Sequence, residues 1–562
     1  MTYHYPTPRH PERKAVHRLT RLLAVQQALR RSGPCPLSLV PVLSFFLFLL
    51  APLYAQTIPY RNPILFADYS DPDAIRYGSH YYLIASTFHF VPGIPILESG
   101  DLVHWTIAGH AVQRLDMDPR YDLTGFGSSP NGYGMGVWAP SIRRHNGLFY
   151  IYFPTPTEGI YVTTARSIAG PWSKPVAVLH QPGLEDPCPF WDDDGQAYLV
   201  HSRKGAGPLI LHRMSPDGLR VLDEGKTIVE DRQNLPTLEG PKFYKRNGWY
   251  YIFAPYGGVA VGKQAVLRSR SIYGPYEQRT VLAQGDTKIN GPHQGAYVET
   301  PSGQGFFLHF QSRGAHGRIV HLEPVTWQDD WPIVGAPIPG STAGQPVPSG
   351  AVSGPGSAAR SQAPGIQTSD EFSSRILGPQ WEWNHNPDSA HWSLAARRGF
   401  LRLIPTHAEG LPSARNTLTQ CMQDNAFELT ARIDIAALKP GSHAGLAMFE
   451  KTASGLEIVR DGEQSRLEYF SLASASPVLI PGPALTHPTL QLRVRVEGDT
   501  ASYSYSLDNG AAFLPLGPAT PIHFSWWKGS RPSLFAYTTE TTPAGSMDID
   551  WVRYHPLAEN PW

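Results

Sequence analysis

Three carboxylates occupy equivalent places in a short unit that recurs along the chain. Asp71, Asp186 and Glu239 each stand one or two residues before a proline that opens a predicted strand. Hydrolysis of a glycosidic bond uses two such groups, because one protonates the leaving oxygen while the other activates water or attacks the sugar. A third carboxylate beside the proton donor raises the donor's pKa by like-charge repulsion. If the fold gathers these residues, acid/base hydrolysis of a sugar is the chemistry that they suit.

An aspartate before a proline also has an ordinary structural explanation, since it commonly starts a turn or caps a strand. One such residue therefore carries little weight. Three acids at matching positions, 115 and 53 residues apart, are harder to explain by turn formation alone. They require an architecture that brings repeated positions to one place.

Five copies of the unit can be traced, each a strand that starts near a proline, a tight turn and a second strand. The prolines are Pro72, Pro140, Pro187, Pro241 and Pro292, at steps of 68, 47, 54 and 51 residues. Asn-Gly and Asp-Gly pairs supply the positive φ angles of two-residue hairpins. Repeats of roughly 40–50 residues that hold several strands are typical of propeller blades around an axis. We therefore predict a five-bladed β-propeller over residues 56–335, with the three carboxylates facing its central funnel.

The composition favours an all-β chain and excludes some kinds of partner. Glycine and proline number 52 and 54 of 562 residues, and helical periodicity is scarce after residue 60. Lys plus Arg and Asp plus Glu both total 47, so no net charge attracts nucleic acid or an anionic membrane surface. A second set of short alternating strands predicts a C-terminal β-sandwich over residues 369–562.

Two segments lie outside these predicted domains. In residues 1–55, Arg30 and Arg31 precede an apolar run over 37–50, which Pro41 interrupts and Ala55 follows. This pattern predicts a secretory signal and a secreted or periplasmic protein, with an uncleaved anchor as the alternative. The run is short for a membrane span, so stable membrane insertion is not expected. Residues 336–368 are rich in Gly, Pro, Ser and Ala and are interpreted as a solvated linker.

The sequence offers little support for disulfide or metal-cluster chemistry. Its three cysteines, Cys35, Cys188 and Cys421, fall in the signal segment, the third repeat and the sandwich, so no disulfide framework is expected. No Cys/His cluster has the spacing of a zinc site. The three aspartates at 192–194 lack the alternating ligands of a calcium loop and are assigned to a hairpin turn.

Four further residues are candidates for the funnel lining, and each has two explanations. Phe88 and Trp138 flank the funnel ends of the first two blades, where aromatic faces either stack on sugars or pack in the core. His293 takes the proline-anchored position of the fifth repeat and is either a buried, satisfied histidine or a ligand of a sugar or an axial cation. Arg318 either binds sugar hydroxyls or remains exposed on the surface.

Several separated motifs occur in an order that resembles glycoside hydrolase family 43, the inverting β-xylosidases and α-L-arabinofuranosidases. The segments that carry this resemblance are Asn62-Pro63-Ile64-Leu65, Asp71-Pro72-Asp73-Ala74-Ile75-Arg76, Trp138-Ala139-Pro140-Ser141, Asp186-Pro187, Glu239-Gly240-Pro241 and Asn290-Gly291-Pro292-His293-Gln294-Gly295. The region after residue 369 is similar to the β-sandwich, a concanavalin-like jelly roll, that often follows the family's propeller.

The resemblance implies a role for each acid. Asp71 matches the general base, Asp186 the acid that tunes and orients the proton donor, and Glu239 the general acid, with Asp71 and Glu239 roughly 6.5–9.5 Å apart as inversion requires. His293 matches an axial histidine that often lies beside a calcium or sodium ion, although the chemistry itself requires no cofactor. Arg318 falls near an arginine that contacts the terminal sugar.

The sequence departs from the family's usual pattern beside the acids, and this leaves the substrate open. Asp73-Ala74 and Cys188-Pro189 replace more usual pairs, which puts the fit of the substrate in doubt rather than the chemistry. A sandwich loop helps to close the pocket in related enzymes, and Trp526-Trp527 is our candidate for that wall.

Three functions compete. The first is an exo-acting, inverting β-xylosidase that trims xylo-oligosaccharides or arabinoxylan fragments, with arabinofuranosidase activity as an addition. The second is an arabinan- or arabinoxylan-specific α-L-arabinofuranosidase. The third is a non-catalytic, carbohydrate-binding propeller with a lectin-like sandwich. Retention of all three acids argues against the third, because a binding module needs no separated acid/base pair.

Overall fold

The computed structural model describes residues 56–123, 131–354, 365–541 and 545–557. The predicted signal segment, residues 1–55, lies outside these ranges and stays a prediction. In the described ranges the elements are strands and a few short 3-10 turns. None of the helical turns there has the length and apolar character needed to cross a membrane.

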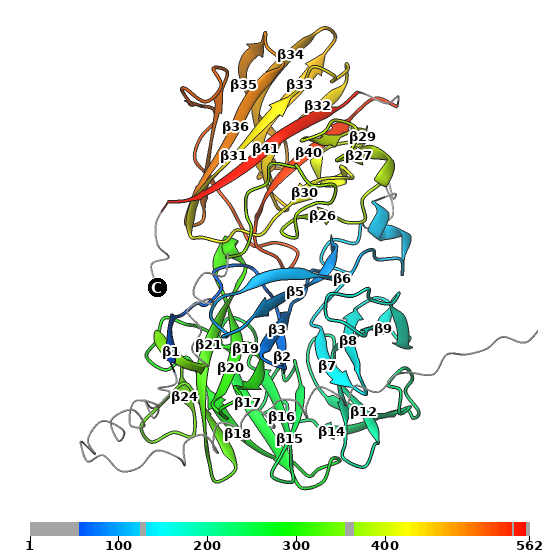
Figure 1. Ribbon diagram of the computed structural model, residues 1–562, viewed down its shortest axis with the longest axis vertical. Helices are drawn as coiled ribbons and strands as arrows, with labels where there is room; N and C mark the ends of the chain where they lie inside the picture. The colour runs from blue at the N-terminus through cyan, green and yellow to red at the C-terminus, as the bar shows by residue number, and fades with distance from the viewer. Residues whose placement is uncertain (1–55, 124–130, 355–364, 542–544, 558–562) are drawn as a thin grey trace, which may run out of the picture. The chain divides into compact units, whose positions relative to one another are not determined.

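Five sheets, each built on four antiparallel strands, form the blades of a propeller (Figure 1). The first three are β2 (Asp73–Tyr77), β3 (His80–Ile84), β5 (Gly93–Ser99) and β6 (Thr106–Val112); β7 (Ser141–His145), β8 (Leu148–Thr155), β9 (Gly159–Ala165) and β10 (Val176–Leu179); and β11 (Leu184–Trp191), β12 (Ala197–Arg203), β13 (Leu209–Met214) and β14 (Lys226–Val229). The last two are β15 (Lys242–Arg246), β16 (Trp249–Tyr256), β17 (Lys263–Ser269) and β18 (Glu277–Leu282); and β19 (His293–Glu299), β20 (Gly305–Ser312), β21 (Arg318–Gln328) and β22 (Trp331–Val334). The prediction of five blades is confirmed.

Each blade begins with the hairpin that the sequence predicts. Asn146-Gly147 joins β7 to β8 with φ angles of 45° and 81°, and Asn247-Gly248 joins β15 to β16 with 50° and 71°. Positive φ at both central residues matches the right-handed twist of the flanking strands. The apolar residues of the blades alternate into layers between neighbouring sheets, such as Cys188, Leu211, Phe243 and Ile252 between the third and fourth blades.

The interpretation of 336–368 as a solvated linker needs correction over residues 336–354. There, β23 (Ala336–Pro337) and β24 (Gly344–Gln345) extend the fourth blade, and β25 (Ser349–Gly354) pairs antiparallel with β1 (Gln56–Arg61). Composition alone misled the prediction, because a Gly- and Ser-rich stretch can still pair with a free strand edge. Val352, which is buried against the propeller, anchors the new strand.

Two large sheets form the C-terminal β-sandwich. One contains β26 (Glu382–Asn384), β29 (Thr406–His407), β30 (Leu418–Thr419), β32 (Ser442–Phe449), β33 (Ser454–Asp461), β34 (Gln464–Ser471), β35 (Val478–Leu485) and β40 (Arg531–Thr538). The other contains β27 (Trp392–Ser393), β28 (Leu401–Leu403), β31 (Ala426–Asp434), β36 (Thr489–Glu497), β37 (Thr500–Ser506), β38 (Leu514–Pro515), β39 (Thr520–Pro521) and β41 (Met547–Pro556).

A short strand from the propeller region joins the sandwich. β4 (Phe90–Val91), which follows the second strand of the first blade, pairs antiparallel with β26 through Trp383 and Asn384. The two domains therefore share one hydrogen-bonded sheet, and apolar residues of both lie in one core cluster. This shared sheet places the sandwich beside the funnel end of the first blade.

Candidate active site

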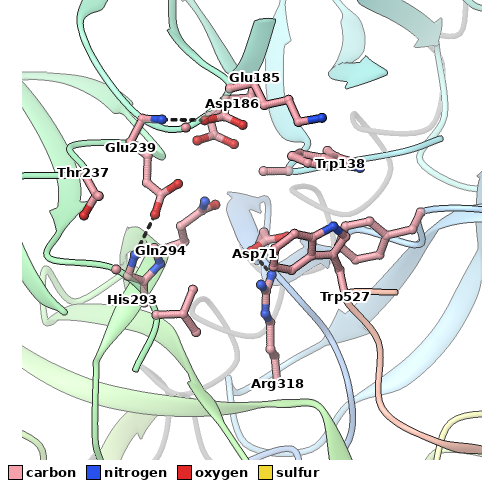
Figure 2. Close-up of a pocket in the computed structure, with 17 residues that line it drawn as sticks. Asp71, Trp138, Glu185, Asp186, Thr237, Glu239, His293, Gln294, Arg318 and Trp527 are labelled. Carbon is pink, nitrogen blue, oxygen red and sulfur yellow. Dashed lines mark hydrogen bonds and ion pairs between the residues drawn. The ribbon is translucent and has the colours of Figure 1, made fainter. Parts of the chain in front are cut away.

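A cavity of about 610 Å³ opens at the funnel of the propeller (Figure 2). The three acids and the four candidates for the funnel lining all border it, namely Asp71, Phe88, Trp138, Asp186, Glu239, His293 and Arg318. Segments far apart in the chain meet here because each blade contributes the start of its innermost strand. The repeat in the sequence therefore predicts the composition of this cavity well.

The backbone at these strand starts is unusual in the same way in several blades. Asp71 and Asp186 have φ angles of 54° and 57°, and Gly240 and Gln294 take the corresponding positions with 57° and 37°. Aspartate tolerates this left-handed region better than most residues. Such strained positions cluster at functional sites, where the surrounding structure holds them.

Asp71 is buried and its two carboxylate oxygens have different partners. Ser86 Oγ donates to Oδ2 at 2.6 Å, and Arg318 Nη1 donates to Oδ1 at 2.7 Å. Arg318 is itself only 6% exposed, so the alternative of a surface arginine is wrong. The pair fixes the orientation of the Asp71 carboxylate toward the cavity.

Asp186 is also buried and is bonded to the backbone beside Glu239. Its Oδ2 accepts from the Gly240 amide at 2.7 Å and from Ser202 Oγ at 3.2 Å. Burial, followed by repulsion from Glu239, raises the pKa of Asp186 to about 7. Asp186 therefore affects Glu239 in two ways. It holds the backbone of the following residue, Gly240, and its carboxyl group interacts electrostatically with that of Glu239.

Glu239 is the most open of the three acids, with 21% of its side chain exposed. Its Oε1 lies 3.0 Å from Nε2 of His293, whose ring is buried. Figure 2 shows this contact between Glu239 and His293. The carboxyl is thus oriented while one face stays open to the cavity.

A fourth carboxylate, Glu185, lines the cavity and was not predicted from the sequence. Its Oε1 accepts from the Ala206 amide at 3.3 Å, and burial together with repulsion from Asp186 and Glu239 raises its pKa to about 9. Neighbours in a regular strand face opposite sides, so a residue next to Asp186 was not expected here. A register shift in β11 between Glu185 and Cys188 removes that alternation.

The cation expected at His293 stays a prediction. Within the described residues, one group of His, Cys, Asp or Glu side chains has potential metal-ligand atoms that all lie within 4.8 Å of one another. This group consists of Glu185, Asp186 and Glu239, and it does not include His293. The chain also supplies its own cation nearby. The buried Lys242 ammonium donates to Ser141 Oγ at 2.8 Å and lowers the pKa of Asp186, which opposes the larger effect of burial.

Aromatic rings form one wall of the cavity. The ring of Trp138 lies 6.1 Å from that of Phe88 and 6.0 Å from that of Trp527, both edge to face. Trp527 comes from the sandwich and is 47% exposed. Its neighbour Trp526 instead stacks on Tyr133 at 4.0 Å, so only Trp527 of the predicted pair lines the cavity.

We expect Trp527→Ala to raise KM for a xylo-oligosaccharide by about 2- to 10-fold, since an aromatic contact of this kind contributes roughly 0.5–1.5 kcal/mol. The substitution leaves the carboxylates untouched, so kcat should change much less. Steady-state kinetics on xylobiose measures both constants. Trp551→Ala, in β41 of the sandwich and outside the cavity, is the matched control. An unchanged KM in Trp527→Ala would remove this residue from the binding wall.

The raised pKa values of Glu185 and Asp186 predict how stability depends on pH. A carboxyl whose pKa is higher in the folded state than in the unfolded chain stabilises the fold below the unfolded value, near 4, and this stabilisation is lost as pH rises through the folded value. The losses should fall between about pH 4 and 7 for Asp186 and between about pH 4 and 9 for Glu185.

Glu185→Gln removes one of these titrations. We therefore expect its Tm to exceed that of the wild type at pH 9 by about 2 °C or more, and the difference to shrink toward pH 5. Thermal unfolding followed by circular dichroism across this range measures the effect. A Tm difference that does not vary with pH would show that Glu185 does not hold its proton in the folded protein.

A propeller funnel that collects several carboxylates in one cavity has the acid/base groups that the glycoside hydrolases, as a class, use. The chain belongs to Glycosyl hydrolases family 43, which matches residues 60–332. Residues 369–555 match the beta xylosidase C-terminal concanavalin A-like domain, which confirms the predicted sandwich.

Similar proteins cover nearly the whole described chain. A putative beta-xylosidase of Xylanibacter ruminicola is 43% identical over 84% of this chain and 85% of its own length. A beta-xylosidase of Formosa agariphila is 36% identical over 88% of this chain and 90% of its own. One solved structure, a GH43 glycoside hydrolase engineered to display both endo-xylanase and exo-arabinofuranosidase activity, has a TM-score of 0.79 and 28% identity, and the match covers 89% of this chain and all of that one.

Proposed function

We propose that this glycoside hydrolase releases terminal xylose from xylo-oligosaccharides or arabinoxylan fragments with inversion at the anomeric carbon. The observation that carries the proposal is the meeting of Asp71, Asp186 and Glu239 in one cavity, each held by different partners. Two relatives at 43% and 36% identity that are named beta-xylosidases support xylose as the sugar.

Asp71 is the general base in this proposal. Its carboxylate accepts a proton from a water molecule that attacks the anomeric carbon, while the bonds from Ser86 and Arg318 keep it aimed. Because Arg318 also lines the cavity, its guanidinium group is placed to donate to a hydroxyl of the terminal sugar.

Glu239 is the general acid and protonates the leaving oxygen. Its partial exposure allows contact with the substrate, and His293 restricts its rotation. Burial, followed by repulsion from neighbouring carboxylates, raises the pKa of Glu185 to about 9 and that of Asp186 to about 7, so these two neighbours of Glu239 add less negative charge beside it near neutral pH than two ionised carboxylates would.

An α-L-arabinofuranosidase is the second candidate. Terminal xylopyranose and arabinofuranose present similar hydroxyl arrangements, and the engineered GH43 enzyme with a similar structure displays exo-arabinofuranosidase activity beside endo-xylanase activity. In this chain Asp73 and Cys188 lie immediately behind the acids and bind Arg143 through its Nη1 and Nη2 at 2.7 and 3.0 Å. The two departures from the family pattern are therefore linked through Arg143, outside the cavity lining.

The test compares hydrolysis of nitrophenyl β-D-xylopyranoside and nitrophenyl α-L-arabinofuranoside by the full-length protein. We expect turnover of both, with a higher kcat/KM on the xyloside. The opposite ranking would favour the second candidate. No turnover of either compound, nor of xylobiose, by correctly folded protein would contradict the proposal and favour a binding module.

A further inference from the structure

A buried aspartate outside the cavity links the sandwich to the proposed base. Asp68 lies between β1 and β2 and is 4% exposed. Its Oδ1 accepts from the Arg318 amide at 2.9 Å and from Ser70 Oγ at 3.0 Å. Its Oδ2 accepts from the Gly529 amide at 2.8 Å and lies 3.1 Å from Lys528 Nζ. One carboxylate therefore joins a propeller residue to two residues that are more than 450 positions away in the chain.

Lys528 and Gly529 belong to the sandwich loop, which we define as residues 522–530 between β39 and β40. Nζ of Lys528 also donates to the carbonyls of Asp68 at 2.9 Å and of Ser86 at 3.4 Å. The ammonium is 2% exposed, so a charged group is buried here with three acceptors around it. Ser86 in turn donates to the Asp71 carboxylate. The sandwich loop therefore contacts the backbone of Ser86 directly and, through Asp68, the backbone of Arg318, which is the other donor to Asp71.

The same loop contacts Arg318 directly. The Arg318 guanidinium carbon lies 4.8 Å from the ring centroid of Phe310 and 5.9 Å from that of Phe524, which is part of the sandwich loop. The backbones also approach closely. A Cβ at Gly317 would lie 2.3 Å from Asp68 Cγ, and one at Gly529 would lie 2.7 Å from the Ala315 carbonyl oxygen. Only glycine fits these two positions without displacing its neighbours.

Asp68 is suited to hold this junction as a carboxylate. Burial alone would raise its pKa, but the charges of Lys528 and Arg531 and the amides of Arg318 and Gly529 lower the pKa below its ordinary value. A buried ion pair whose oxygens are all hydrogen-bonded is rigid, and removal of either partner leaves an uncompensated charge.

We propose that Asp68 and Lys528 are positioning residues, through which the sandwich loop holds Arg318 and Ser86 in the geometry that aims Asp71. This inference rests on the proposed role of Asp71. It assigns the sandwich a second contribution to the site besides the Trp527 wall. Within the propeller, Arg318 is the first residue of β21. Asp68 binds its backbone amide, and Phe524 of the sandwich loop contacts its guanidinium group.

The test uses Lys528→Met and Asp68→Asn in the full-length protein. Small misplacements of a catalytic group can cost up to about 10²-fold in rate, so we expect kcat on nitrophenyl β-D-xylopyranoside to fall by about 10- to 100-fold and KM to change by less than about 3-fold. Lys528→Arg retains the charge and should recover part of kcat. Circular dichroism and Tm verify that each variant is folded at the assay temperature.

Asp499→Ala is the matched control, because it removes another contact between the domains without touching Asp68. Asp499 Oδ1 accepts from the Ala315 amide at 3.1 Å and is not part of the cavity. We expect its kcat to stay within about 2-fold of the wild type. If loss of any domain contact lowered kcat, this variant would behave like Lys528→Met, and the proposal would be overturned.

A double variant shows whether the effect passes through Arg318. In an Arg318→Ala background, Lys528→Met should cost much less than it does in the wild type, because the positioned group is gone. Folded Lys528→Met and Asp68→Asn variants with wild-type kcat would overturn the proposal, as would an equal loss in both backgrounds. The turnover of the wild type, recorded first, tests the proposed function separately. The positioning role of Asp68 and Lys528 is judged only from the ratio of each variant's kcat to the wild-type kcat.

Discussion

Asp71→Asn should lower kcat on nitrophenyl β-D-xylopyranoside by about 10²- to 10⁴-fold and leave KM nearly unchanged. Asparagine has the shape of aspartate and can keep partners at Ser86 and Arg318, but its amide cannot take a proton from water. The loss therefore reports the chemical step. Steady-state kinetics provides the measurement, and the Tm verifies that the variant is folded.

The matched control for this variant is Asp286→Asn, at an exposed aspartate outside the cavity. Its kcat and KM should equal those of the wild type. A folded Asp71→Asn protein that retains more than about a tenth of the wild-type kcat would rule out Asp71 as the base.

Glu239→Ala should show a loss that depends on the leaving group. Nitrophenolate leaves with little protonation, whereas the sugar alcohol that leaves from xylobiose requires a proton. We therefore expect the fall in kcat/KM to be at least about 10² larger on xylobiose than on nitrophenyl β-D-xylopyranoside. Parallel assays of both substrates with the same protein preparation give this ratio directly.

Glu185→Gln separates this effect from a general disturbance of the carboxylate group. Glu185 lies in the same cavity and close to Glu239. Any loss in this variant should be similar on the two substrates, because Glu185 is not the proton donor. Equal losses on both substrates in Glu239→Ala would contradict its assignment as the general acid.

The propeller was predictable because its local rules agree with one another. Each blade opens with an alternating strand, an Asn-Gly or similar turn and a second strand, and the period of the prolines gives the number of blades. The same period identified Asp71, Asp186 and Glu239, since equivalent positions of a propeller point toward one axis. The family resemblance added Arg318 and the sandwich wall, for which the repeat alone gives no argument.

Other parts of the site depend on geometry that alternation does not encode. Glu185 faces the cavity because of a local bulge, which a pattern of period two cannot anticipate. The junction of Asp68 with Lys528 joins residues 460 positions apart, and neither belongs to a repeated unit. Residues 349–354 pair with the free edge of β1, and β23 and β24 add to the edge of the fourth blade at β18, although the composition of this stretch is typical of a linker.

The stereochemistry of the first product tests the central claim most directly. Proton NMR, recorded within the first minutes of hydrolysis of nitrophenyl β-D-xylopyranoside, distinguishes the anomers of free xylose before they interconvert. A base that activates water on the face opposite the leaving group yields α-xylose first, and this is the result that the proposed roles of Asp71 and Glu239 predict. Initial release of β-xylose would indicate retention through a covalent intermediate and would contradict the account.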